Sequence, residues 1–141
     1  MSDTTPRFIA LDIHAQPLAD GMPHLITRDT RTGLEWTDAT ASISRPHAEA
    51  MTACEAVTIA GGGWRAPTRE ELLSIVDISR CDPAVDPEAF PFVKPRWYWS
   101  SDAAAWSSAS AWLVHFNGGF VYYGLRRNGG GFALAVRRAG Q

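Results

Sequence analysis

Apolar and polar residues alternate with a period of two through the last third of the chain, a pattern typical of β-strands with one buried face. Asn117-Gly118-Gly119 and the segment 128–131 are rich in turn-forming Asn and Gly. The pattern therefore predicts antiparallel strands joined by tight turns. The expected strands are 97–99, 112–116, 120–123 and 132–136.

The same alternation predicts which side chains face the core. The inner side is expected to carry Trp112, Val114, Phe116, Val121 and Tyr123. The outer side is expected to carry Leu113, His115, Asn117, Phe120 and Tyr122. Exposed aromatic rings are costly unless they bind something, so the outer side is a candidate binding surface.

A first helix is expected over 46–59, with Ser44 as its N-cap, Pro46 in the first turn and Gly61-Gly62-Gly63 as its end. Its apolar stripe is predicted to be Ala48, Met51, Ala53, Cys54 and Val57.

A second helix is expected after Thr68, because Thr68 and Glu71 have the T-x-x-E spacing of a capping box. It is predicted to bury Leu72, Leu73, Ile75 and Val76.

The Pro-rich stretch 77–95 is predicted to be a long surface loop. Residues 1–27 are predicted to form an N-terminal arm with short strands, used for docking or oligomerisation, and residues 28–141 a single ligand-binding domain.

The chain of 141 residues is 45% hydrophobic and 20% charged, which excludes a disordered tail, a collagen or a coiled coil. No apolar run approaches the ~20 residues of a membrane helix. The first 13 residues do not resemble a Sec signal, so a phage virion or the cytoplasm before export is expected. The net charge of −2 gives no sign of nucleic-acid binding.

Charge is divided unevenly: residues 1–93 sum to −7 and residues 94–141 to +5. The basic third is also rich in aromatic residues. Either its cations pair with the acidic part, or they form a surface suited to anionic or sugar ligands.

Cys54 and Cys81 lack the spacing of a metal site, and the four histidines are scattered, so no zinc site is expected. Two free buried thiols are favoured over a disulfide.

The acids Asp77, Asp82 and Asp86 could form an acidic site. The favoured interpretation is that they cap the Pro-rich loop. With no nucleophile beside a base, an enzyme is not expected.

Several motifs occur together in one order: R-T-G-L-E-W (31–36), G-G-G-W-R-A-P-T-R-E-E-L (61–72), D-P-A-V-D (82–86), W-Y-W-S-S (97–101), A-W-L-V-H-F (111–116) and A-V-R (135–137). Over residues 28–138 this pattern resembles the Lcl C-terminal domain family. The resemblance implies an α+β, C-type-lectin-like fold with two helices packed on twisted antiparallel sheets. It also implies an adhesin or receptor-binding role, a possible homotrimer and sulfated polysaccharide as one ligand class.

Related lectin-like domains are the variable proteins of diversity-generating retroelements, in which mutable Asn codons never become Lys, Glu, Gln or Met. Residues 97–139 contain none of these four types, whereas residues 1–96 contain eleven. Because strands also disfavour Glu and Lys, diversification and plain β-composition both remain open. Many family members carry a cysteine where Ala135 stands, so Cys54 has lost that partner.

The predicted function is non-catalytic ligand binding, either to a glycan or to a surface protein of a host or neighbouring cell. A phage-tail or fimbrial assembly module, and a lectin of fixed specificity, are the alternatives. No cofactor or metal is expected, and binding is predicted to be independent of calcium. The candidate ligand-binding residues are Trp106, His115, Asn117, Phe120, Tyr122, Leu125, Arg126, Arg127, Asn128 and Phe132.

Gly62, Gly63 and Trp64 are predicted to be scaffold, with Trp64 filling the core between helix and sheet. Arg137 is expected to pair internally with an acid such as Asp77 or Asp86.

Overall fold

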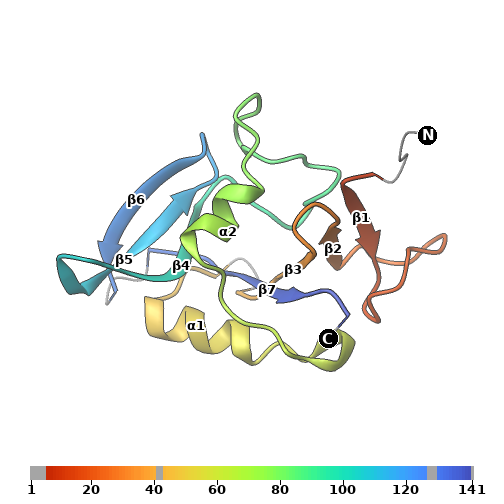
Figure 1. Ribbon diagram of the computed structural model, residues 1–141, viewed down its shortest axis with the longest axis horizontal. Coiled ribbons are helices and arrows are strands. Elements are labelled where there is room, and N and C mark those ends of the chain that lie inside the picture. Colours follow the sequence, from red (N-terminus) through yellow and green to blue (C-terminus); the bar gives the residue numbers. More distant parts are fainter. Residues whose placement is uncertain (1–5, 41–42, 127–129, 141) are drawn as a thin grey trace.

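The computed structural model describes residues 6–40, 43–126 and 130–140. Within these ranges, seven strands form two antiparallel sheets against which two α-helices pack, so the predicted α+β class is confirmed (Figure 1). The helices are α1 (His47–Glu55) and α2 (Arg69–Ser74), with a short 3-10 helix, η1, at Ile59–Gly61. The strands are β1 (Phe8–Leu11), β2 (Ile26–Asp29), β3 (Leu34–Asp38), β4 (Trp97–Ala104), β5 (Ser107–His115), β6 (Phe120–Leu125) and β7 (Leu134–Arg138). None of the described helices combines the length and the apolar character needed to span a bilayer.

The sequence pattern placed the last strand in the same sheet as the other C-terminal strands, and this prediction is wrong. Instead β7 pairs with β3, from Leu34 opposite Arg138 to Asp38 opposite Leu134, and the four-stranded sheet has the order β1-β2-β3-β7. The alternating side chains of β7 are buried on both faces: Leu134 and Val136 join one core cluster, and Ala135 joins the other. Burial on both faces therefore explains why this strand is apolar throughout.

The two N-terminal strands belong to the same sheet. β1 pairs with β2 and β2 with β3, and Leu11 is completely buried. The predicted boundary between residues 27 and 28 consequently falls inside β2. A role of this segment in docking or oligomerisation stays a prediction.

The first helix is shorter than predicted and starts differently. Its N-cap is Pro46 rather than Ser44, and no side chain caps it. Arg45 forms an isolated bridge with Gly131, which holds the backbone extended just before the helix. The buried face of α1 is His47, Ala50 and Cys54, whereas Ala48 is exposed.

The second helix confirms the capping box. Thr68 Oγ1 accepts from Glu71 N at 3.1 Å, and Glu71 Oε1 accepts from Thr68 N at 2.8 Å. Leu72 and Ile75 are buried as expected, whereas Leu73 is exposed on the outer side of α2.

The Pro-rich stretch 77–95 is not a surface loop throughout. Ala84 N donates to Phe116 O at 2.7 Å, and the segment inserts apolar side chains into the main core. The inserted side chains are Val85, Ala89, Phe90 and Val93. Short apolar pairs between prolines carry no helical or strand periodicity, which is why sequence patterning placed them outside the core.

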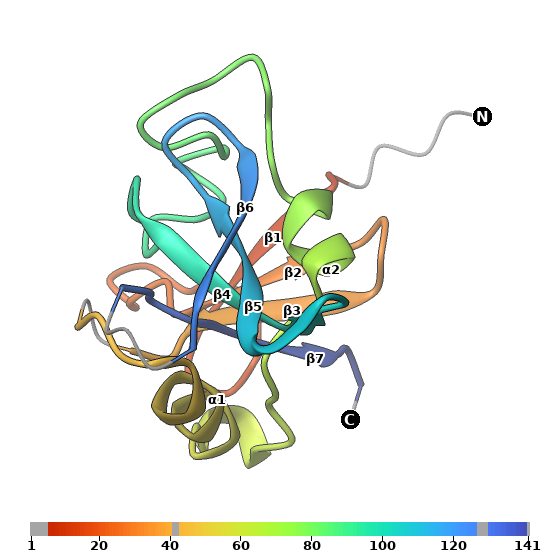
Figure 2. The same cartoon turned by 90° about the vertical axis from the view of Figure 1, so that its left-hand side faces the viewer.

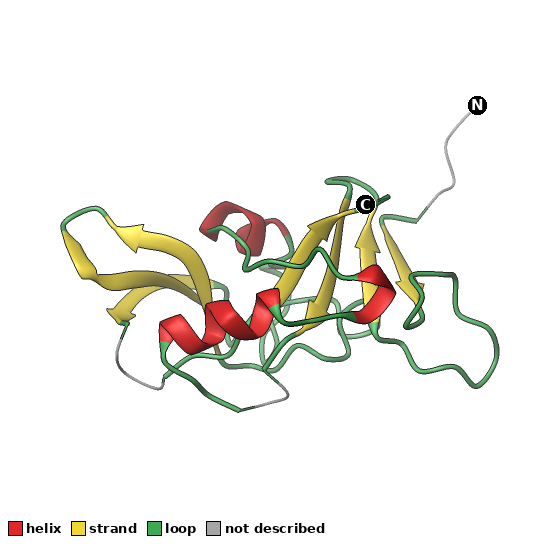
Figure 3. Ribbon diagram, turned by 90° about the horizontal axis from the view of Figure 1, so that it is seen from below, coloured by secondary structure: helices red, strands yellow, loops and turns green. Residues whose placement is uncertain are grey.

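The three-stranded sheet β4-β5-β6 occupies one end of the molecule. Figure 2 looks onto this end and shows the sheet in front, with α1 below it and α2 to its right. Seen from below, its outer part extends past both helices (Figure 3). This projecting part of the sheet is the region with the most exposed aromatic rings.

Candidate functional site

Six aromatic side chains of the three-stranded sheet form what we term the aromatic surface. Four of them are strongly exposed: Phe120 is 68%, Trp106 61%, Tyr122 56% and Tyr123 46% accessible. The partly buried members are Trp97 and Trp112. Three of the six come from β6, and Trp106 lies in the turn between β4 and β5.

Five of the six rings contact one another in series, whereas the Phe120 ring lies against Gly118. The Trp97 ring lies 5.5 Å from that of Tyr122, which stacks on Tyr123 with an interplanar angle of 6° at 5.4 Å. Tyr123 and Trp112 then contact Trp106 edge-to-face at 5.2 and 5.3 Å. These mutual contacts restrict the rings, so a ligand would meet a surface that is already ordered.

An apolar hollow of about 240 Å³ opens beside β6. Gly124 leaves room there, since a Cβ at this position would lie 3.1 Å from Leu113 Cδ1. The indole N–H of Trp99 is already donated to Arg45 O at 2.9 Å. The lining residues are Trp97, Trp99, Leu113, Tyr122, Tyr123, Gly124 and Gly130.

A second, more polar hollow lies where α2 meets β4. The Arg69 guanidinium sits 4.7 Å over the Trp112 ring, and Asp102 Oδ2 accepts from Arg69 N at 2.6 Å. Thr68, Glu70 and two alanines complete its lining.

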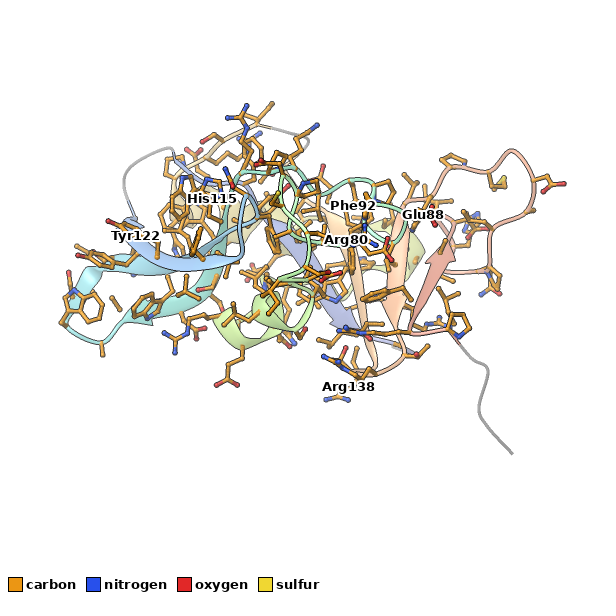
Figure 4. All side chains as sticks on the ribbon, turned by 90° about the horizontal axis from the view of Figure 1, so that it is seen from above. Arg80, Glu88, Phe92, His115, Tyr122 and Arg138 are labelled. Carbon is orange, nitrogen blue, oxygen red and sulfur yellow. The ribbon has the colours of Figure 1, made fainter. Side chains whose placement is uncertain are left out.

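Five of the predicted site residues lie on the aromatic surface or next to it: Trp106, His115, Asn117, Phe120 and Tyr122. The ring of His115 lies 4.1 Å from that of Trp97, and its Nδ1 accepts from Asn117 N at 2.9 Å. Desolvation lowers the pKa of His115, which favours the neutral ring. Figure 4 shows His115 and Tyr122 on the three-stranded sheet, well apart from Arg138.

Two predicted site residues make contacts within the fold. The Arg126 guanidinium donates to His47 Nδ1 at 3.2 Å and to Ser108 O at 3.0 Å, which ties the end of β6 to α1 and β5. Phe132 is partly buried and packs against the main core, where its ring lies 5.7 Å from that of Tyr98. A contribution of Phe132 to the binding surface stays a prediction.

The remaining predicted residues are only partly placed. Leu125 is the last residue of β6, and its backbone continues the ladder with β5. Arg127 and Asn128 lie outside the described residues.

The predicted division into inner and outer faces fails at two positions. Leu113 is buried and Tyr123 is exposed, the reverse of the expectation. One reason is that the outer part of the sheet extends beyond the core, so both of its faces reach solvent there. The pairing of β4 with β5 is also irregular between Trp99 and Ala104, which changes the twist.

Sequence reasoning missed Trp97, Trp112, Tyr123 and Arg69 as members of the site. The residues 107–111 that lengthen β5 are Ser and Ala, which give no alternating signal. The long hairpin that carries Trp106 and exposes Tyr123 was consequently not predicted.

Away from this sheet, Arg137 pairs with Glu35 at 3.0 Å rather than with Asp77 or Asp86. Trp64 is buried against Arg137, as its predicted scaffold role requires.

Both cysteines are free, but Cys81 is exposed rather than buried. Burial raises the pKa of the Cys54 thiol to about 12, which keeps it protonated and unreactive. No group of three metal-binding side chains occurs among the described residues.

The family model of the Lcl C-terminal domain matches residues 25–137. No curated protein and no solved structure matches the chain. The match spans most of the chain, and the chain belongs to the Lcl C-terminal domain family.

Proposed function

We propose that this protein is a non-catalytic ligand-binding domain of the receptor-binding or adhesin type, which binds through the aromatic surface. The observation that carries the proposal is the presence of four strongly exposed aromatic rings on one sheet, three of which contact one another in series. Full burial of a large apolar side chain stabilises a protein by roughly 1.5–3 kcal/mol. Rings held in solvent forgo much of that stabilisation, and a contiguous group of them is typical of a binding surface.

The chemistry of the surface suits recognition. Tyrosine and tryptophan offer large contact areas with few rotatable bonds, and their O–H and N–H groups add directional hydrogen bonds. Arg69 adds a cation held against an indole ring. The ligand belongs to the surface of a host or neighbouring cell and is either a glycan or a protein.

The distribution of residue types also supports this proposal. The stretch without Lys, Glu, Gln or Met, residues 97–139, includes all three strands of the projecting sheet and also β7 of the four-stranded sheet. Variation there would change the aromatic surface while leaving β1, β2, β3 and both helices untouched.

The test is a binding screen on an array that carries sulfated and neutral glycans together with purified bacterial surface proteins. Tyr122→Ala should weaken binding to any captured member at least tenfold, since hot-spot rings contribute about 2 kcal/mol or more. Met22→Ala changes an exposed side chain in the segment between β1 and β2 and should leave binding unchanged. Figure 1 shows this segment at the end of the molecule away from the three-stranded sheet. Binding should also survive a calcium chelator. Equal binding by both variants, or no binding at all, argues against the proposal.

A further inference from the structure

The outer strand β6 leaves one edge of its sheet open. It has β5 on one side, and no described strand lies on the other. The opposite edge of the sheet is covered by Phe132, whose N–H donates to Trp97 O at 2.7 Å and whose C=O accepts from Trp99 N at 2.9 Å. Of the two edges of this sheet in the described part of the chain, β6 is therefore the more open one.

The register of the ladder identifies the free backbone groups. Arg126 N donates to Ala109 O at 2.8 Å in the register of the β5–β6 pairing. Residues of an antiparallel ladder alternate between facing their partner strand and facing away from it. The N–H and C=O groups of Val121, Tyr123 and Leu125 consequently point away from β5, and an extended polypeptide presents the matching donors and acceptors.

The open edge has none of the usual protection. Natural edge strands carry Lys, Pro or a bulge that discourages pairing with another chain. β6 has the sequence FVYYGL, without charge or proline, and pairs regularly with β5 along its length. An edge of this kind is either an aggregation hazard or a place where a partner strand binds.

The apolar hollow selects against a sugar at this position. A sugar ring needs several hydrogen bonds to replace those it makes with water, and the hollow is lined mostly by carbon. A strand added to β6 would direct alternate side chains onto the face that carries Gly124. An apolar side chain of that strand fits the hollow.

Charge distinguishes between possible partner strands. Arg126 follows β6 directly, and its guanidinium donates to His47 Nδ1 and Ser108 O. It forms no ion pair with a carboxylate of the described residues, so its charge is not neutralised there. A positive charge at this end of β6 favours a partner segment with an acidic residue beside it.

We propose that the ligand is a protein that adds an extended segment to the open edge of β6, with an apolar side chain in the hollow and an acidic residue at the end beside Arg126. This inference rests on the proposed function, because it identifies the ligand of the same sheet. β6 is six residues long, which sets the length of the added strand.

The first experiment uses short synthetic peptides with glutamate at both ends and varied apolar residues in the centre, immobilised beside matched peptides that end in lysine. Glutamate-ended peptides should bind at least about tenfold more tightly, and the difference should shrink with salt. N-methylation of alternate amides in the best peptide should distinguish the amides that face β6 from those that face away from it. Methyl groups on the amides that face β6 should weaken binding about tenfold, and those on the other amides should not. Equal effects of both sets would refute strand addition.

The second experiment compares two variants that lose the same ring. Tyr123→Ala keeps the outward N–H, whereas Tyr123→Pro removes it without touching the ladder to β5. The proline variant should bind the best peptide at least about tenfold more weakly than the alanine variant. Circular dichroism and a melting curve confirm that both are folded, and the methylated peptides decide the question if the proline variant is not.

The outcomes separate this inference from the proposed function. If no peptide binds but a glycan does, and Tyr122→Ala abolishes that binding, the aromatic surface is a binding site and the polypeptide ligand is wrong. If light scattering shows a dimer that Tyr123→Pro converts to a monomer, a second copy occupies β6 and the inference is wrong. If neither peptides, glycans nor surface proteins bind, the proposed function fails as well.

Discussion

Replacing Glu35 should strongly destabilise the fold, because its carboxylate joins three parts of the molecule. Glu35 is 1% exposed, and its Oε1 accepts from Arg137 Nε at 3.0 Å. Its Oε2 accepts from both Nε and a terminal nitrogen of Arg28 at 3.0 and 2.7 Å. Arg137, itself 3% exposed, also donates to the carbonyl oxygens of Ala60 and Gly62. The ion pair thereby fixes β7 to β3 and to the segment around η1.

The size of the effect follows from what Glu35→Ala leaves behind. Removing one member of a buried ion pair typically costs about 3–5 kcal/mol, because the other charge stays buried without a counter-ion. Arg28 is one-third exposed and can turn to water, but Arg137 cannot. Two carbonyl oxygens and the Trp64 ring, 4.5 Å away, still stabilise the Arg137 cation. The lower end, about 3 kcal/mol, is therefore expected.

Urea denaturation and a melting curve measure this effect. For a chain of this length, about 3 kcal/mol corresponds to a decrease in Tm of about 9 °C. Asp77→Asn, which breaks the exposed Arg80–Asp77 pair, is the control and should leave Tm unchanged. The double variant Glu35→Leu, Arg137→Leu should recover part of the lost stability, because it removes the unpaired charge. A Tm for Glu35→Ala equal to that of Asp77→Asn would show that the buried pair contributes nothing.

Three other predictions address the scaffold, the histidines and the gene. Trp64→Ala should destabilise the protein by about 3–5 kcal/mol, measured by urea denaturation, because it empties a buried site and removes the ring beneath Arg137. Desolvation lowers the pKa of His47, His24 and His115, so below pH ~6.5 the unfolded chain binds more protons than the fold. Tm should therefore fall as pH decreases through this range, and less steeply in His47→Gln; a Tm independent of pH would contradict the assignment. Sequencing the DNA beside the gene should reveal a near-copy of codons 97–138 that differs mainly at adenines, next to a reverse-transcriptase gene, if the region is diversified.

The elements that could be predicted from the sequence are those whose signals are local. The capping box of Thr68 and Glu71, the turn at 117–119 and the exposed rings of Phe120 and Tyr122 all follow from neighbouring residues. Elements that depend on distant contacts could not be predicted this way. The pairing of β7 with β3 requires knowledge of which strand is adjacent, and the start of α1 is set by the bridge between Arg45 and Gly131.

Only part of the candidate site could be predicted, because alternation is also a local signal. Alternation identified the outward rings of β6, but it assumes that one face of each strand is buried. That assumption fails where the hairpin projects beyond the core, and Tyr123 is exposed there although the pattern placed it inside. Arginine is a residue type that often contacts ligands. The hydrogen bonds of Arg126 to His47 and Ser108 O also give it a structural role, which no sequence pattern shows.

The four strongly exposed rings of the aromatic surface lie outside the motifs that carry the family resemblance, whereas Trp97 and Trp112 lie within them. Glu35, Trp64 and Arg137 come from three motifs far apart in the chain, and they meet beside the four-stranded sheet. The exposed rings, in contrast, all lie on the three-stranded sheet. Changes at Glu35 or Trp64 should therefore alter Tm, whereas changes at Tyr122 should alter binding and leave Tm nearly constant. Such a division allows the binding sheet to vary in sequence without loss of the fold, which is the property that a diversified receptor binder requires.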